Sequence, residues 1–266
     1  MTEIMIEKKR RLEEYLRSLG GVFTAYSAGV DSTFLLKVAH DVLGDNAAAV
    51  TASSVFFPKE ELETAKEFCR SHNIRHIVIE HDPLSDESIV QNPPDRCYIC
   101  KKSLFTRMRA LADESDVEHI IDGTNADDDK DYRPGQRALS ELGIKSPLRE
   151  VGLTKAEIRQ LSEEMGLETW DKPALACLAT RIPTGDRLTV EKLCMAGDAE
   201  RYIRSLGFSQ LRVRVHGNIA RIETDIADIP RMTEPETADK IKRTLKGMGF
   251  RFVTLDLGGY RMGSMN

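Results

Sequence analysis

Two cysteines stand three residues apart in the segment NPPDRCYIC. Cys97 and Cys100 have the spacing of a redox disulfide, of half a zinc site, or of two ligands of an iron–sulfur cluster, and spacing alone does not choose among these. A third thiol, Cys177, lies between turn residues and beside basic residues, where a polarised, accessible thiolate is expected. Cys69 and Cys194 lie in helical patterns and are interpreted as small packing residues.

The segment SAGVDS, residues 27–32, joins an apolar run to a helical pattern. A loop at this position in a parallel sheet binds phosphates, because N–H groups at the start of the helix point toward the anion. Ser27 and Ser32 add hydroxyl donors, and Gly29 permits close approach of the backbone. The Walker and dinucleotide-binding patterns are both missing from the sequence. On these six residues alone, an ordinary strand–helix turn with a serine cap remains an alternative.

A basic stretch interrupts an acidic chain. The formal net charge of −5 argues against a general nucleic-acid binder, yet residues 201–221 hold five arginines and no carboxylate. If 210–216 is a strand, Arg212 and Arg214 share one face and lie about 6.6 Å apart along the backbone. Together with a carboxylate on the next strand, two such arginines suit a substrate phosphate. The alternative is a solvated hairpin at the edge of a sheet.

Hydrophobic periodicity predicts the elements that position these residues. Short apolar runs alternate with helical patterns over about the first 175 residues, which predicts an α/β fold with a parallel sheet. Strands are expected over 22–26, 47–54, 74–80 and 118–125. Helices are expected over 1–20, 32–44 and 58–73, after Cys97, and over 154–165. After a turn-rich segment at 170–186, the order helix, two strands, helix, strand predicts a small α+β domain, with its elements at 190–207, 210–224, 234–249 and 251–258.

The composition is that of a soluble globular protein, with 41% hydrophobic and 30% charged residues among 266. No apolar run approaches the roughly 18 residues that span a bilayer. The first twenty residues form an amphipathic pattern rather than a signal peptide. Five cysteines, an odd and sparse set, indicate a reducing compartment. We therefore expect a cytoplasmic protein with no membrane or nucleic-acid partner.

SAGVDS resembles the SGGxDS motif of the PP-loop ATP pyrophosphatases, which adenylylate a substrate oxygen and release pyrophosphate. Here the second position is Ala28, whose methyl group is expected to crowd the pyrophosphate slightly and to cost nothing only if its φ is negative. DGTN, residues 122–125, resembles an adenylate-side motif of several of these enzymes and is expected at the same sheet edge. The resemblance implies a site for ATP and Mg²⁺ made by Ser27, Gly29, Asp31, Ser32, Ser53, Gly123, Thr124 and Asn125.

Over nearly its whole length the chain resembles the LarE family of ATP-dependent sulfur transferases. The shared landmarks are SAGVDS, NPPDRCYICK, DGTNADD, WDKPALACLATRIP, LRVRVHG and FVTLDLGGYRMGS. The resemblance implies a Rossmann-like PP-loop domain over 1–180, a small α+β domain over 181–266, and a symmetric homo-oligomer. It also implies adenylylation, then thiolation, of the carboxylates of a pyridinium-3,5-biscarboxylic acid mononucleotide. The product is the precursor of the nickel-pincer cofactor of lactate racemase.

Two chemical versions occur in that family. In one, a cysteine at the position of Cys177 gives up its own sulfur and becomes dehydroalanine. In the other, three cysteines hold a 4Fe–4S cluster that carries an extra sulfide, which an external sulfur donor must replace. The presence of Cys97, Cys100 and Cys177 favours the cluster version. A zinc site completed by His81 or His119, or a disulfide relay between the first two cysteines, remains an alternative.

The resemblance also implies roles in the second half of the chain. Arg212 and Arg214 resemble phosphate-binding arginines, and Glu200 and Glu223 resemble carboxylates that hold a divalent ion. Arg181 is expected to stabilise charge that develops near Cys177, although an arginine beside a loop is commonly a surface residue. The competing functions are a tRNA thiolase, an amide-forming synthetase and a nucleotide-binding module without turnover. The acidic chain and the lack of a glutaminase domain disfavour the first two.

Overall fold

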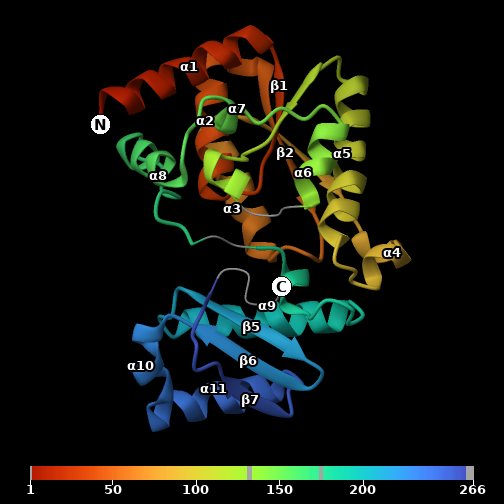
Figure 1. Ribbon diagram of the computed structural model, residues 1–266, viewed down its shortest axis with the longest axis vertical. Helices are drawn as coiled ribbons and strands as arrows, with labels where there is room; N and C mark the ends of the chain where they lie inside the picture. The colour runs from red at the N-terminus through yellow and green to blue at the C-terminus, as the bar shows by residue number, and fades with distance from the viewer. Residues whose placement is uncertain (1, 131–133, 174–175, 262–266) are drawn as a thin grey trace. The chain divides into compact units, whose positions relative to one another are not determined.

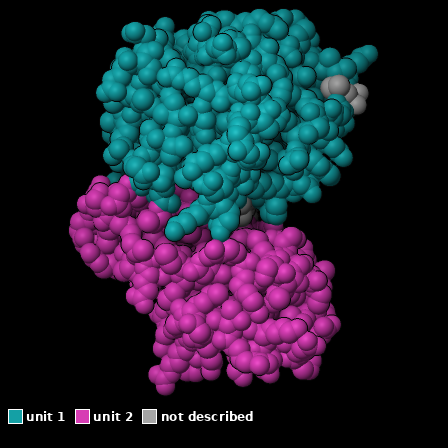
Figure 2. All heavy atoms as spheres, turned by 180° about the vertical axis from the view of Figure 1, so that it is seen from behind, with its two compact units in different colours: residues 1–54, 59–81, 95–174 teal, residues 55–58, 82–94, 175–266 magenta. Residues whose placement is uncertain are grey.

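The computed structural model describes residues 2–130, 134–173 and 176–261 (Figure 1). The chain divides into two compact units (Figure 2). The first comprises residues 1–54, 59–81 and 95–174, and the second comprises 55–58, 82–94 and 175–266. The second unit therefore includes two short segments from the first half of the chain. No helix among the described residues is both long enough and apolar enough to cross a membrane.

The first unit contains a four-stranded parallel sheet in the order β3-β2-β1-β4. Its strands are β1 Val22–Ala25, β2 Ala47–Ser53, β3 Arg75–Glu80 and β4 His119–Ile121. The sheet confirms the predicted α/β fold. β4 is shorter than the predicted strand over 118–125, because the chain leaves the sheet before the DGTN motif.

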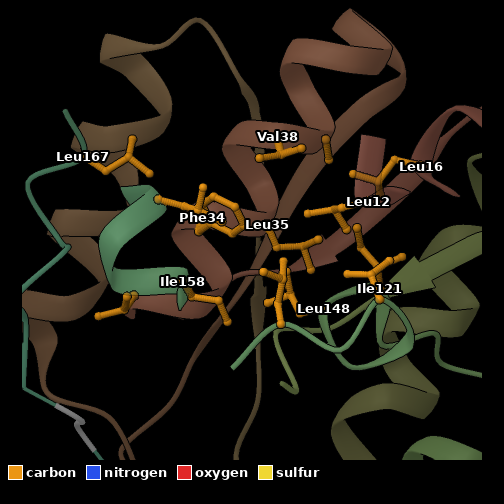
Figure 3. Close-up of a cluster of buried hydrophobic side chains, with 14 of the residues drawn as sticks. Leu12, Leu16, Phe34, Leu35, Val38, Ile121, Leu148, Ile158 and Leu167 are labelled. Carbon is orange, nitrogen blue, oxygen red and sulfur yellow. The ribbon is translucent and has the colours of Figure 1, made fainter. Parts of the chain in front are cut away.

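Helices cover both faces of this sheet. They are α1 Glu3–Leu19, α2 Val30–Leu43, α3 Lys59–Ser71, α5 Arg96–Glu114, α6 Pro134–Glu141, α7 Pro147–Glu150 and α8 Lys155–Glu164. Val22 and Phe23 are consecutive in β1 and so point to opposite faces. Val22 joins the apolar cluster of α1, α2, α7 and α8 that Figure 3 shows, whereas Phe23 packs with side chains of α5 and α6.

The strand order creates a switch point between β1 and β4. The chain moves from β1 to β2 and on to β3, then returns to pair β4 with the other side of β1. The loops that leave β1 and β4 therefore emerge side by side at the carboxyl edge of the sheet. Parallel sheets bind their ligands at this position.

The second unit has a three-stranded sheet in the order β5-β6-β7, with β5 Leu211–His216, β6 Ile219–Thr224 and β7 Phe252–Leu255. Its helices are α4 Glu87–Val90, α9 Val190–Ser205, α10 Ile229–Thr233 and α11 Pro235–Gly247. The order α9, β5, β6, α11, β7 confirms the predicted α+β pattern. β5 and β6 are antiparallel, and His216 pairs with Ile219 across a two-residue turn in which Gly217 has a φ of 58°.

Candidate functional site

The SAGVDS loop brings two hydroxyl groups to the start of α2. Gly29 is the N-cap residue of this helix. The Ser27 and Ser32 Oγ atoms lie 3.1 Å apart, and the Ser27 N–H donates to Ser32 Oγ at 3.3 Å. Ser32 Oγ in turn lies 3.3 Å from the Gly29 carbonyl oxygen, to which it donates. The loop thus presents hydroxyl groups at a helix N-terminus, where the partial positive charge of the helix favours an anion.

Ala28 adopts an unusual backbone conformation. Its φ is 54°, in the left-handed region, which costs a residue with a side chain about 1–2 kcal/mol. Alanine was expected to cost nothing only with a negative φ, so Ala28 carries a conformational cost. Its side chain is fully buried and packs in a cluster with Tyr26, Leu36 and Ala49. Because the methyl group faces the core, the expectation that it crowds a bound pyrophosphate is wrong.

We expect Ala28→Gly to leave the free energy of unfolding within about 1 kcal/mol of its original value. Removing the left-handed strain stabilises the protein, while loss of a buried methyl group and the greater flexibility of glycine in the unfolded chain oppose it. The rate of ATP-dependent pyrophosphate release should stay the same or rise. Chemical denaturation and a steady-state pyrophosphate assay measure the two quantities, and a large loss of turnover would contradict this account of the loop.

The DGTN segment packs against the SAGVDS loop. A Cβ atom at Gly123 would lie 3.0 Å from the backbone nitrogen of Ser32 and 3.3 Å from the carbonyl carbon of Asp31. The Asn125 side-chain amide donates to the Asp31 carboxylate at 3.4 Å. These contacts confirm that the segment lies at the same sheet edge as SAGVDS. A side chain at position 123 would force the backbone of Ser32 or Asp31 to shift by a few tenths of an ångström.

Other residues that were predicted to bind ATP lie around this edge of the sheet. Thr124 Oγ1 donates to the Asp122 carboxylate at 2.5 Å, and Ser146 Oγ donates to the same carboxylate at 2.6 Å. Asp122 thereby fixes the shape of the loop after β4. Ser53 is the last residue of β2, on the other side of β1.

Two lysines that the sequence did not single out contact the SAGVDS loop. Lys155 Nζ forms an ion pair with the Asp31 carboxylate. Lys172 Nζ donates to the Ala28 carbonyl oxygen at 2.9 Å and to Glu61 Oε2 at 2.7 Å. Lys172 belongs to the WDKP landmark, which was interpreted only as a loop. Lys155 follows a helix cap and carries no sequence signal of its own.

Cys97 and Cys100 lie near the start of α5, and the helix expected after Cys97 begins one residue before it, at Arg96. Neither forms a disulfide among the described residues; Cys97 is exposed and Cys100 partly buried. Arg96 Nη2 donates to Cys97 Sγ at 3.6 Å, and His81 Nε2 lies 3.7 Å from Cys100 Sγ. Both sulfur atoms thus lie beside nitrogen atoms of basic side chains.

Cys177 belongs to the second unit and caps a short 3₁₀ helix, Leu178–Arg181. Its side chain is partly exposed and forms no disulfide among the described residues. Its carbonyl oxygen accepts hydrogen bonds from Thr180 N at 3.0 Å and Thr180 Oγ1 at 2.7 Å. The loop conformation expected for this cysteine is thus held by a compact turn.

The two remaining cysteines differ in burial. Cys69 is buried, and burial raises the pKa of its thiol to about 12, which confirms it as a packing residue. Cys194 is exposed, so the interpretation of this residue as packing is wrong. Leu193 occupies the buried position beside it on α9.

Metal ligands do not cluster within the part of the chain that the structure describes. There, no group of three or more His, Cys, Asp or Glu side chains is arranged to hold a metal ion. Of the two histidines considered for zinc, His81 lies beside Cys100, while the His119 ring lies 3.8 Å from the Glu118 carboxylate.

In the second unit, Arg181 is buried rather than on the surface, with 1% of its side chain exposed. Its Nε and Nη2 donate to the two carboxylate oxygens of Glu200 at 2.7 Å and 3.1 Å. Arg204 adds a second cation to Glu200 at 2.8 Å. Burial by itself would raise the pKa of Glu200, but Arg181 and Arg204 hold that pKa below its ordinary value. Glu200 is therefore a buried carboxylate that orients arginines.

Arg212 and Arg214 are also buried, at 2% and 5% exposure, so the interpretation of a solvated hairpin is wrong. Arg214 Nη2 donates to Glu223 Oε2 at 2.7 Å, and Arg221 Nη2 donates to Glu223 Oε1 at 2.9 Å. The Arg212 guanidinium lies 4.9 Å from the centre of the Tyr260 ring. Burial, with Arg181 nearby, lowers the pKa of Arg212.

The described part of this cluster has an excess of positive charge. Its cations are Arg181, Arg204, Arg212, Arg214 and Arg221, and its anions are Glu200, Glu223 and Asp256. Buried guanidinium groups in excess over carboxylates are suited to bind a phosphate, because each presents several N–H donors in a rigid plane.

Comparison with known proteins decides the family. No family model matches the chain. An uncharacterized protein of Synechocystis sp. is 43% identical over 263 residues, 98% of each chain. The pyridinium-3,5-bisthiocarboxylic acid mononucleotide synthase of Lactiplantibacillus plantarum is 41% identical over 262 residues, 97% of this chain and 94% of that protein. This chain belongs to the LarE family.

Shorter matches place the LarE-family chain among PP-loop enzymes. One component of the glutamine-hydrolysing GMP synthase of Thermoplasma volcanium is 25% identical over 61% of this chain, and the tRNA-specific 2-thiouridylase of Rhizobium etli is 26% identical over 55%. Together with the full-length relatives, they identify the chain as an ATP pyrophosphatase-type, adenylylating sulfur transferase.

Proposed function

We propose that this LarE-family enzyme adenylylates the carboxylates of pyridinium-3,5-biscarboxylic acid mononucleotide and converts them to thiocarboxylates. One observation carries the proposal: 41% identity over 97% of the chain to a synthase named for the bisthiocarboxylic acid product. The PP-loop at the β1–β4 edge supports it, because adenylylation requires ATP to be held with its α-phosphate open to attack.

Adenylylation converts a carboxylate oxygen of the substrate, which is a poor leaving group, into part of AMP, which is a good one. A carboxylate oxygen of the substrate attacks the α-phosphorus of ATP, the bond to the β-phosphate oxygen breaks, and pyrophosphate leaves with the electron pair. The α2 N-terminus and the Ser27 and Ser32 hydroxyls lie where they can bind the pyrophosphate as its charge develops. Asp31 is suited to bind Mg²⁺ at the phosphates, because carboxylates are ligands that this ion prefers. The acyl adenylate then loses AMP when sulfur attacks its carbonyl carbon.

The substrate phosphate is proposed to bind Arg212 and Arg214. Glu223 forms ion pairs with Arg214 and Arg221, and Glu200 with Arg181 and Arg204, so the two carboxylates would act by orienting the arginine cluster. A divalent ion at either carboxylate would have to displace these cations. Arg181, whose Nη1 donates to the Ala176 carbonyl oxygen at 3.0 Å, is proposed to hold the Cys177 turn and to stabilise charge there.

Three accessible thiols supply the sulfur chemistry in this proposal. Cys97, Cys100 and Cys177 are all at least partly exposed, which suits cysteine ligands of an iron–sulfur cluster, and Arg96 donates to the sulfur atom of Cys97. A 4Fe–4S cluster held by the three would supply sulfide to the acyl adenylate. The competing proposal is that Cys177 gives up its own sulfur once.

Pyrophosphate release tests the reaction. We expect ATP turnover to pyrophosphate and AMP only when the pyridinium biscarboxylic acid mononucleotide is added, together with a product whose mass shows oxygen replaced by sulfur. Unmodified tRNA and xanthosine monophosphate are the controls for a thiouridylase and for an amide-forming synthetase. Turnover with either control alone, or ATP binding without any pyrophosphate release, would contradict the proposal.

Iron and acid-labile sulfide in anaerobically purified protein test the sulfur source. We expect about four irons per chain, with at least as much sulfide, and loss of both in Cys97→Ala. Exposed Cys194→Ala is the matched control and should retain the iron. The absence of iron under strict anaerobiosis would contradict the proposed cluster. Loss of the mass of one sulfur atom from Cys177 after the reaction would then show that Cys177 itself is the sulfur donor.

A further inference from the structure

Lys172 connects the phosphate-binding SAGVDS loop to Glu61 on α3 of the first unit. Its Nζ donates to the Ala28 carbonyl oxygen at 2.9 Å and to Glu61 Oε2 at 2.7 Å, and only 19% of its side chain is exposed. Arg159 fixes the backbone that carries Lys172, because its two Nη groups donate to the carbonyl oxygens of Trp170 and Lys172 at 2.6 Å and 2.8 Å. Lys172 is therefore a restrained cation.

The bond from Lys172 determines how the peptide between Ala28 and Gly29 is oriented. In a trans peptide the C=O and the following N–H point in opposite directions. With the Ala28 carbonyl oxygen held toward Lys172, the Gly29 N–H points away from it. Among the described residues this N–H has no hydrogen-bond acceptor, and Gly29 is the N-cap of α2. Lys172 thus fixes the direction of an N–H donor in the loop.

The peptide between Ala28 and Gly29 rotates through the ψ of Ala28 and the φ of Gly29. Its rotation would turn the Gly29 N–H out of its present direction, and glycine, which accepts many φ values, does little to oppose it. The hydrogen bond from Lys172 to the Ala28 carbonyl oxygen opposes this rotation. The φ of 54° at Ala28 depends on the preceding peptide and is not fixed by this bond.

We propose that Lys172 is a positioning residue for ATP, which holds the peptide between Ala28 and Gly29 and so keeps the Gly29 N–H directed at the bound phosphates. The inference depends on the ATP site and not on the choice of pyridinium substrate. It deepens the account of that site, since it assigns the loop conformation to a side chain 144 residues away in the sequence.

A double-mutant cycle with Ala28→Gly tests this role. The dissociation constant of α,β-methylene-ATP, measured by titration calorimetry, needs no second substrate. We expect Lys172→Met to weaken binding about tenfold, the equivalent of one misdirected hydrogen bond to a phosphate. In the Ala28→Gly background the same substitution should weaken binding by more than about tenfold, because glycine at position 28 leaves ψ freer once the lysine is gone.

Lys8→Met provides a matched control. Lys8 and Glu157 form an ion pair at 2.7 Å, and their side chains are 22% and 20% exposed. The pair between Lys172 and Glu61 is similar, at 2.7 Å with side chains 19% and 18% exposed. Lys8→Met should therefore lower the melting temperature as much as Lys172→Met but leave the affinity for the nucleotide analogue unchanged. Should Lys172→Met fail to fold, Lys172→Gln takes its place in the cycle.

Two outcomes would overturn the proposal. One is unchanged nucleotide affinity in Lys172→Met. The other is an equal loss of affinity in both backgrounds, which would mean that Lys172 acts on ATP or on the fold rather than on Ala28. A wild-type protein that does not bind the analogue would overturn the ATP site itself. Binding of the analogue without turnover of the pyridinium substrate would overturn only the proposed function.

Discussion

Replacing Glu200 by glutamine is expected to lower the free energy of unfolding by about 3–5 kcal/mol. The side chain is 2% exposed and binds Arg181 through both oxygens and Arg204 through one, and it accepts the Val213 N–H at 3.1 Å. Glutamine has nearly the same shape but presents an NH₂ group and no charge. The buried Arg181 guanidinium would lose its carboxylate partner, and this cost dominates.

Chemical denaturation measures the change, and Glu236→Gln is the matched control. Glu236 forms an i,i+4 ion pair with Lys240 in the same unit, but both side chains are exposed to solvent. Exposed pairs contribute little, so the control should unfold like the wild type. If Glu200→Gln behaved like the control, the buried arginine cluster would not be the stabilising feature that the geometry indicates.

The effect of Glu200→Gln should depend on pH. The folded-state pKa of Glu200 lies below its ordinary value of 4.5, so the unfolded chain takes up the proton more readily. The stabilisation is therefore fully present above pH 4.5 and is lost as the pH falls through the folded-state pKa. The difference in stability between wild type and Glu200→Gln should shrink under those acidic conditions, and a difference that stays constant would contradict this assignment.

Gly123→Ala is expected to reduce kcat/KM for ATP by about tenfold. The added methyl group would meet backbone atoms of Ser32 and Asp31 at 3.0 Å and 3.3 Å, and neither can move without shifting the start of α2. The SAGVDS and DGTN loops must then separate by a few tenths of an ångström. A shift of that size costs part of the roughly 100-fold loss in rate that a misplacement of about 1 Å produces.

Steady-state pyrophosphate release at varied ATP concentration measures this loss. Gly21→Ala is the control in the same unit, because its methyl group would meet its nearest neighbour, the Asn46 carbonyl oxygen, at an ordinary 3.6 Å. Near-normal kinetics in a folded Gly123→Ala protein would show that the two loops do not act together on ATP.

Periodicity and motif context predicted most of the fold and the position of the phosphate loop. Each strand of the first sheet was predicted, because buried parallel strands are short, apolar runs between helical patterns. β4 was predicted too long, since the hydrophobic run EHII continues into DGTN without a break in the sequence. Alternation correctly placed Arg212 and Arg214 on one face, but it could not reveal that this face is covered.

What the sequence left undetermined depends on contacts between distant residues. Nothing local marks Lys172 as a partner of Ala28, or Lys155 as a partner of Asp31, because each pair is joined only when the chain folds. The sign of φ at Ala28 is likewise set by packing of its methyl group in the core. Cys194 illustrates the reverse case, where a helical pattern alone could not tell a buried face from an exposed one.

The interleaving of the two units has a consequence for synthesis on the ribosome. Segments 55–58 and 82–94 belong to the second unit. The Phe56 carbonyl oxygen accepts from Leu178 N, and the Val90 carbonyl oxygen accepts from Leu188 N. At about 5–20 residues per second, these early segments wait several seconds for partners made about 100 residues later. Phe56, Ile89 and Val90, buried in the finished protein, are solvent-exposed or chaperone-bound during that interval, and a chain truncated after residue 174 never buries them against those partners.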